Sequence, residues 1–219
     1  MTPGRRQALV VRGGWDGHQP RETTNLFLPF LDDHGFRVVV EDTLEAYEDE
    51  KLLSQTDLIV QCWTAGDITP GESAGLAAAV RAGTGLAGWH GGIVDAFPAD
   101  PGYPLLVGGR RVPGAPTGAT QLITPAPEHA DHPVLAGLDA FTVPAEPYWV
   151  HGDPLNDVLA TVTFDADETR ARPVAIPAVW TRRWGRGRVF VSTLGHDLAD
   201  FRVPAVRALT ERGLLWASR

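Results

Sequence analysis

Cysteine is almost absent from this sequence, since Cys62 is the single example in 219 residues. One cysteine cannot form an internal disulfide, so a disulfide-stabilised secreted scaffold is excluded and we expect a reducing, cytoplasmic compartment. Long apolar runs are also missing. The apolar run that follows Arg5 and Arg6 covers only residues 8–11, which is too short for a secretory signal or a membrane span. We therefore expect no membrane partner.

Long basic runs are missing as well. The chain has 19 basic and 27 acidic residues, and its net charge of −8 argues against a surface for nucleic acid or anionic membranes. The one local cluster of arginines brackets Trp184-Gly185, and a solvated hairpin turn explains it; its members are Arg182, Arg183, Arg186 and Arg188. The partner we expect is a small molecule.

The first half of the chain alternates between buried strands and helices. The hydrophobic share of the whole chain, 43%, supports an ordinary globular core. Helical patterns fill the segments between the strands, which predicts an α/β fold with a mostly parallel central sheet and helices on both faces. The expected strands are residues 7–12, 36–41, 57–62 and 85–88.

Two helices of this half carry clear local signals. The helix expected over 21–34 contains Pro29, which should kink it or delay its regular part. The next helix begins at Thr69-Pro70-Gly71-Glu72, where Thr69 and Glu72 have the spacing of a capping box. Gly83 is expected to end that helix.

The second half is less regular. Residues 108–118 are rich in Gly and Pro and predict a long loop, whereas 180–189 predict a hairpin and 203–216 a closing helix. The sequence leaves open whether the strands of this half extend the main sheet. No linker divides the chain, so we predict a single domain over 1–219. The expected strands are residues 119–124, 141–143, 158–164, 174–181 and 188–193.

Glycines crowd around one histidine in the stretch Gly88-Trp89-His90-Gly91-Gly92. This is the spacing of a strand-to-helix elbow, which raises its central residue above the end of a sheet. Hydrolases and amidotransferases carry Ser or Cys there, whereas this chain carries His90. An ordinary glycine-rich turn is the alternative interpretation.

Several motifs together resemble the trehalose-utilisation (ThuA-like) family. They are the elbow, the segments 185–190 and 192–197, the first strand leading to His18, His132-Pro133 with Gly137-Leu138, Tyr148 after an acidic residue, and the terminal 213–217. The resemblance spans roughly residues 8–217. It implies a flavodoxin-like three-layer sandwich similar to class I glutamine amidotransferases, and a role in the use of trehalose, other disaccharides or keto-sugars. It implies no particular reaction.

The elbow argues against glutaminase activity. Glutamine hydrolysis requires a thiolate nucleophile at that position, and His90 replaces it. Cys62 lies at the end of a different strand and is expected to be a small core residue.

Three histidines are expected at one edge of the sheet. His18 and His90 follow adjacent parallel strands, and His196 with Asp197 follows the strand at 188–193. If that strand joins the sheet in parallel, the three imidazoles meet and could bind a divalent metal, zinc or manganese. They could instead act as general acid and base, with Asp197 and Glu146 as candidate catalytic carboxylates.

Aromatic residues favour a carbohydrate ligand, because flat ring faces suit the C–H faces of a pyranose. The candidates follow strands or lie in the second half, and the alternative is that they only cover the end of the sheet. They are Trp15, Trp63, Trp89, Tyr148 and Trp149.

Two functions remain open. The first is a sugar-modifying enzyme, a hydrolase, isomerase or lyase, and the second is a sugar-binding or regulatory protein without catalysis. The sequence is compatible with a homo-oligomer and does not determine the assembly.

Overall fold

The computed structural model describes residues 5–114 and 120–219. Ala119, the first residue of one predicted strand, and part of the predicted 108–118 loop lie outside the described residues. The central feature is a nine-stranded sheet in the order β2-β1-β3-β4-β11-β10-β9-β6-β7. Its strands are β1 (Arg6–Gly14), β2 (Phe36–Glu41), β3 (Leu58–Thr64), β4 (Gly85–Trp89), β6 (Gln121–Pro125), β7 (Phe141–Val143), β9 (Asp157–Phe164), β10 (Val174–Trp184) and β11 (Gly187–Ser192).

The first five strands in this order are all parallel. Numbered by their order along the chain, they follow the 2-1-3-4-5 arrangement of flavodoxin-like sheets. The order in which the chain adds strands to the sheet reverses at β1 and β3: β2 lies on one side of β1, and the later strands lie on the other. Ligands in such folds bind beyond the carboxyl ends of the strands near this switch point. β11 pairs in parallel with β4, so the question that the sequence left open is resolved: the second half extends the main sheet.

The remaining strands continue the sheet antiparallel to one another. A separate two-stranded sheet pairs β5 (Gly109–Arg111) with β8 (Val150–Gly152). The sequence analysis placed β5 inside a loop and did not predict β8. Three residues of strand leave too short a pattern to be distinguished from the Gly- and Pro-rich segment around them.

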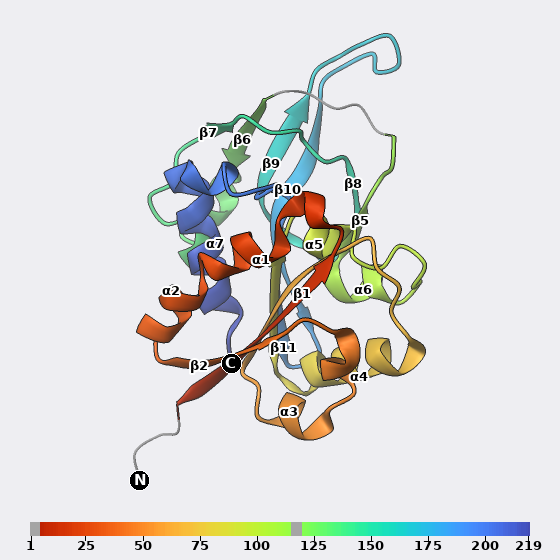
Figure 1. The fold of residues 1–219 in the computed structure, drawn as a ribbon. Coiled ribbons are helices and arrows are strands. Elements are labelled where there is room, and N and C mark those ends of the chain that lie inside the picture. The colour runs from red at the N-terminus through yellow and green to blue at the C-terminus, as the bar shows by residue number, and fades with distance from the viewer. Residues whose placement is uncertain (1–4, 115–119) are drawn as a thin grey trace.

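Helices cover both faces of the sheet, which makes a three-layer sandwich (Figure 1). The first face carries α1 (Pro20–Asn25), α2 (Leu28–Asp33) and α7 (Pro204–Ala217). The opposite face carries α3 (Glu50–Ser54), α4 (Pro70–Ala82), α5 (Gly91–Val94) and α6 (Tyr103–Val107). In the described residues, no helix is both long enough and apolar enough to cross a membrane.

Local sequence signals explain where these helices begin and end. Pro29 does more than kink the predicted 21–34 helix, because the chain forms two short helices with a break before Leu28. At α4, the Glu72 amide donates to the Thr69 hydroxyl (3.2 Å) and the Thr69 amide donates to the Glu72 carboxylate (2.8 Å). The predicted capping box is confirmed, and Gly83 follows the last turn with a φ of 120°.

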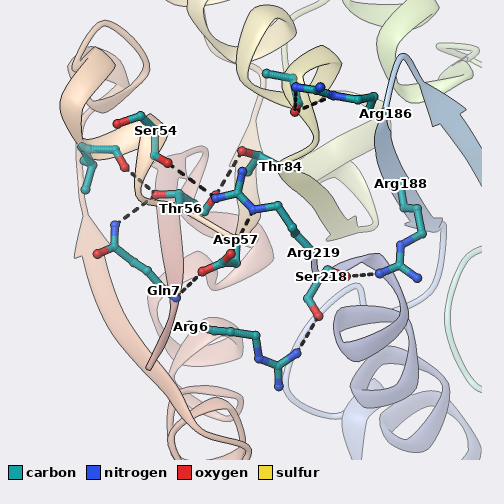
Figure 2. Close-up of polar contacts among 12 residues, drawn as sticks. Arg6, Gln7, Ser54, Thr56, Asp57, Thr84, Arg186, Arg188, Ser218 and Arg219 are labelled. Carbon is teal, nitrogen blue, oxygen red and sulfur yellow. Dashed lines mark hydrogen bonds and ion pairs between the residues drawn. The ribbon is translucent and has the colours of Figure 1, made fainter. Parts of the chain in front are cut away.

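A polar network closes the amino ends of the parallel strands (Figure 2). The Asp57 carboxylate accepts from the Gln7 amide (2.8 Å) and from Arg219 Nε (3.0 Å), while its backbone carbonyl accepts from the amides of Gly85 and Arg219. Arg188 donates to the carbonyl of Ser218. The end of the chain is thereby fixed under β1, β3 and β4, far from the carboxyl ends of these strands.

Candidate histidine site

His90 occupies the strained position of the elbow, between β4 and α5. Its backbone has φ 48° and ψ −142°, a conformation that non-glycine residues rarely adopt. The His90 amide donates to the carbonyl of Ser192 (2.7 Å), which fixes the turn to the end of β11. Gly91 and Gly92 must be small, because an added Cβ would lie 2.5 Å from His18 Cε1 or 2.9 Å from the Cα of Cys62. The unusual backbone conformation of His90 is typical of functional positions.

The ring of His90 has a defined tautomer. Nδ1 lies 2.7 Å from the carbonyl oxygen of Thr193, which can only accept, so Nδ1 carries the proton. Burial and the neighbouring His18 lower the pKa of His90 well below its usual value, so the ring is neutral. Nε2 therefore has a free lone pair, and it faces His196.

His18 ends a 3-10 helix (Asp16–His18) that follows β1. Its Nδ1 lies 3.0 Å from the hydroxyl of Thr64, the last residue of β3. Burial, followed by electrostatic interactions with His196 and Arg111, lowers the pKa of His18 to about 4. A second neutral imidazole thus stands at the switch point of the sheet.

His196 comes from the loop after β11. The buried Asp200 carboxylate shapes this loop by accepting from the amides of Gly195 (3.1 Å) and His196 (2.8 Å). Nδ1 of His196 lies 3.0 Å from Nε2 of His90, so it donates a hydrogen bond to the free lone pair of that ring.

The predicted convergence of the three histidines is confirmed. One nitrogen from each of His18, His90 and His196 lies within 4.8 Å of the other two. Tetrahedral zinc with nitrogen ligands at 2.0–2.1 Å would hold them about 3.3 Å apart, so small side-chain movements suffice. Thr193 contacts Nδ1 of His90, and Thr64 contacts Nδ1 of His18. In zinc sites, outer partners contact the ring nitrogen that does not bind the metal in the same way.

The two predicted carboxylates, Asp197 and Glu146, are not hydrogen-bond partners of the histidine rings in the described residues. The Asp197 side chain accepts from the amide of Ala199 (2.7 Å), so it caps the turn after His196. Burial is the main cause that raises the pKa of Tyr148, and the nearby Glu146 carboxylate adds to it. Among the hydrogen bonds and ion pairs of the described residues, none joins either carboxylate to a histidine ring. Burial lowers the pKa of His18, and the nearby Asp197 carboxylate opposes that shift; a catalytic role for Asp197 and Glu146 stays a prediction.

Two of the five predicted aromatic residues contact the histidines. The ring of Tyr148 stacks on His90 with centroids 3.9 Å apart, and its hydroxyl lies 3.5 Å from Nε2 of His18. Trp15 meets the His18 ring edge-on at 4.7 Å and is 56% exposed. An exposed indole beside a buried imidazole is suited to stack on a ligand.

The other three tryptophans pack within the protein. The prediction that Trp89 contacts a ligand is wrong, because its side chain is 1% exposed and packs against Phe27 and Phe201. Trp149 packs on Phe164. Trp63 is half-buried and packs against Gly13 of β1 and against Gly66. All three support the end of the sheet, which is the alternative that the sequence left open.

Three residues beside the histidines were not predicted. Thr64 is the last residue of a buried strand, and this position alone could have marked it as a candidate site residue. Thr193 acts through its backbone carbonyl, which no sequence pattern reveals. Arg111 forms an ion pair with Asp95 (3.1 Å), and its guanidinium carbon lies 4.7 Å from the centroid of the Tyr148 ring. Arg111 falls in the segment predicted to be a loop, so no signal could have found it.

Cys62 cannot supply the nucleophile that the elbow lacks. It is buried behind Gly92, and burial raises the pKa of its thiol to about 12. Because glutamine hydrolysis needs a thiolate, this geometry supports the expectation that the chain is not a glutaminase.

These observations define a class: a flavodoxin-like three-layer α/β sandwich with a histidine cluster where its parallel strands end. The ThuA family, described as trehalose utilisation, matches residues 7–217. The chain belongs to this family.

Solved structures agree on the fold. A ThuA-like protein from Bacteroides uniformis superposes with a TM-score of 0.78 at 19% identity, covering 99% of this chain and 93% of that one. A second, from Parabacteroides merdae, gives 0.75 at 17% identity, with coverages of 97% and 90%. A protein described as cytoplasmic from Salmonella typhimurium LT2 gives 0.63 at 12%, with coverages of 97% and 100%. Among curated proteins, none matches the sequence.

Proposed function

We propose that this protein is a zinc-dependent enzyme that acts on a carbohydrate, with His18, His90 and His196 as the metal ligands. The observation that carries the proposal is the convergence of three imidazole nitrogens within 4.8 Å. Three protein ligands are the number that catalytic zinc sites use, since the fourth position is left for water or substrate.

The donor set favours zinc over manganese. All three ligands are imidazoles, which suit zinc, whereas manganese prefers carboxylate and carbonyl oxygen. The low pKa values of His18 and His90 keep both rings unprotonated, so protons compete little with a metal there. His196 would give up the hydrogen bond to His90, and its Nδ1 would have to lose the proton it donates there before a lone pair on that nitrogen could bind the metal.

Bound zinc would supply Lewis-acid polarisation of a sugar oxygen and a water of lowered pKa. The protein's own groups would orient the substrate. Trp15 offers an exposed ring face for a pyranose, and the Tyr148 hydroxyl can donate to a sugar oxygen from its position beside His18. The family description, trehalose utilisation, favours a carbohydrate as the substrate.

Zinc binding is the first test. We expect metal analysis of the purified protein to find about one zinc per chain, and we expect His90→Gln and His196→Gln each to weaken zinc binding by about 10- to 100-fold or more. His34→Gln is the matched control, because His34 is exposed at the end of α2. Equal zinc affinity in all four proteins would refute the proposed site.

Turnover is the second test, and it separates an enzyme from a sugar-binding protein. Proton NMR of a panel of disaccharides and keto-sugars should detect conversion by the zinc-loaded protein and none by His90→Gln. Sugar binding that His90→Gln leaves unchanged, without conversion, would instead indicate the non-catalytic sugar-binding function.

A further inference from the structure

A cavity lies between α5, α6 and β5, and Arg111 in its wall also contacts the Tyr148 ring that stacks on His90. Its volume is about 310 Å³, at the lower end of the range for small-molecule sites. The three elements contact one another and lie side by side in Figure 1. The cavity begins close to His90, because α5 follows that residue directly and Asp95 at the end of α5 lines the wall.

The charge of the wall is positive. Among the described residues that line the cavity, the charged ones are Asp95, Arg110 and Arg111, so the wall carries two arginines and one carboxylate. Asp95 pairs with Arg111 through a single nitrogen, Nη1. Arg110 is exposed, and no ion pair to it is found within 5–114 and 120–219. One positive charge is therefore left without a compensating group in this wall.

Arg111 also connects the cavity to the histidines. Its guanidinium carbon lies 4.7 Å from the centroid of the Tyr148 ring, and that ring stacks on His90 at 3.9 Å. A molecule that reaches from the zinc ligands past Tyr148 would meet the remaining guanidinium nitrogens of Arg111. Arginine forks bind carboxylate and phosphate groups with paired, charge-assisted hydrogen bonds.

We infer that the substrate of the histidine cluster is an anionic sugar, whose carboxylate or phosphate group binds in this cavity at Arg110 and Arg111. The inference rests on the proposed function for the identity of the reacting centre. It adds the substrate class: a sugar acid or a sugar phosphate in preference to a neutral sugar.

Calorimetric titration of the full chain with three probes tests this inference: glucuronate, glucose 6-phosphate and glucose. We expect at least one anionic sugar to bind about tenfold or more tightly than glucose, and we expect salt to weaken that preference. Preference for glucuronate would identify a carboxylate, and preference for glucose 6-phosphate would identify a phosphate.

Three variants locate the charge. Arg110→Gln removes an exposed cation, and Arg111→Lys keeps the charge but loses the fork; each should reduce the preference for the anionic sugar. Arg183→Gln is the control, because it removes an equally exposed cation from the β10–β11 hairpin at the other end of the sheet. Glucose binding as tightly as both anionic probes, no measurable binding of either, or a preference that persists in the Arg110→Gln/Arg111→Lys double variant would overturn the inference.

The same samples separate this inference from the proposed function. If zinc does not bind but the arginine-dependent preference is present, the zinc enzyme fails and the anion site stands. If zinc binds through the three histidines but the preference is absent, the zinc site stands and the anionic substrate fails.

Discussion

The reactivity and the allowed size of single residues at the elbow depend on the side chains that pack against them. Cys62 lies on β3 beneath Gly92, and its Sγ is 3.8 Å from the Thr23 hydroxyl. Burial raises the pKa of the thiol to about 12, so at pH 8 almost no thiolate is present. We predict that iodoacetamide labels Cys62 slowly in the native protein and rapidly in urea. Rapid native labelling would show that the elbow opens readily or that the thiol is accessible.

Gly91 gives a second prediction at this scale. A Cβ there would lie 2.5 Å from His18 Cε1, so Gly91→Ala must displace the imidazole. We expect a loss of about 1–3 kcal/mol in the free energy of unfolding, as overpacking costs, and weaker zinc binding. Gly102→Ala is the control, because its added Cβ would meet only a carboxylate oxygen of Asp100, at 3.3 Å. Chemical denaturation and zinc titration measure both effects, and equal behaviour of the two variants would contradict the packing argument.

Among the elements, α4 tests whether a helix can be weakened without affecting the site. Thr69→Ala removes the hydroxyl that caps Glu72, which should lower the free energy of unfolding by about 1 kcal/mol, while Thr69→Ser should restore it. Because no residue of α4 belongs to the histidine cluster, zinc affinity should be unchanged. Urea titrations with zinc binding measured in parallel check this prediction, and a matching loss of zinc affinity would contradict it.

The elements also differ in how far the sequence predicted them. Buried runs and caps specified β1 to β4 and α4, because each signal lies within a few residues of the element it specifies. The break between α1 and α2 follows from Pro29, and the sequence predicted a disturbance there without its extent. β5 and β8 were not predicted, because each is short and its only strand partner is the other, which lies about forty positions away in the chain.

For the whole molecule, the polar network at the amino ends of the strands gives a further prediction. Asp57→Ala leaves the buried Gln7 amide without its acceptor and should cost about 1–3 kcal/mol of stability. Arg219→Ala removes a largely exposed partner of the same carboxylate and should cost about 1 kcal/mol or less. Urea unfolding compares the two, and an equal cost would show that the exposed ion pair contributes most of the stabilisation.

The sequence by itself determined the parallel first half of the sheet, the elbow with its histidine, and the family. These depend on local spacing: alternating strands and helices, glycines around His90, and motifs that occupy fixed positions. The sequence also named all three histidines as candidates, because each follows a predicted strand.

The tertiary structure alone decided that these histidines meet. Their convergence depends on β11 joining β4 in parallel, and that pairing connects residues about one hundred positions apart without any local signal. It also decided which aromatic residues are exposed, because Trp89 is buried against Phe27 and Phe201, whereas Trp15, which contacts His18 by one edge, is 56% exposed. The tertiary structure also decided the position of Arg111, because the pairing of β5 with β8 brings this residue beside Tyr148. Strand pairing and packing are non-local, so the site exists only once the sheet is assembled.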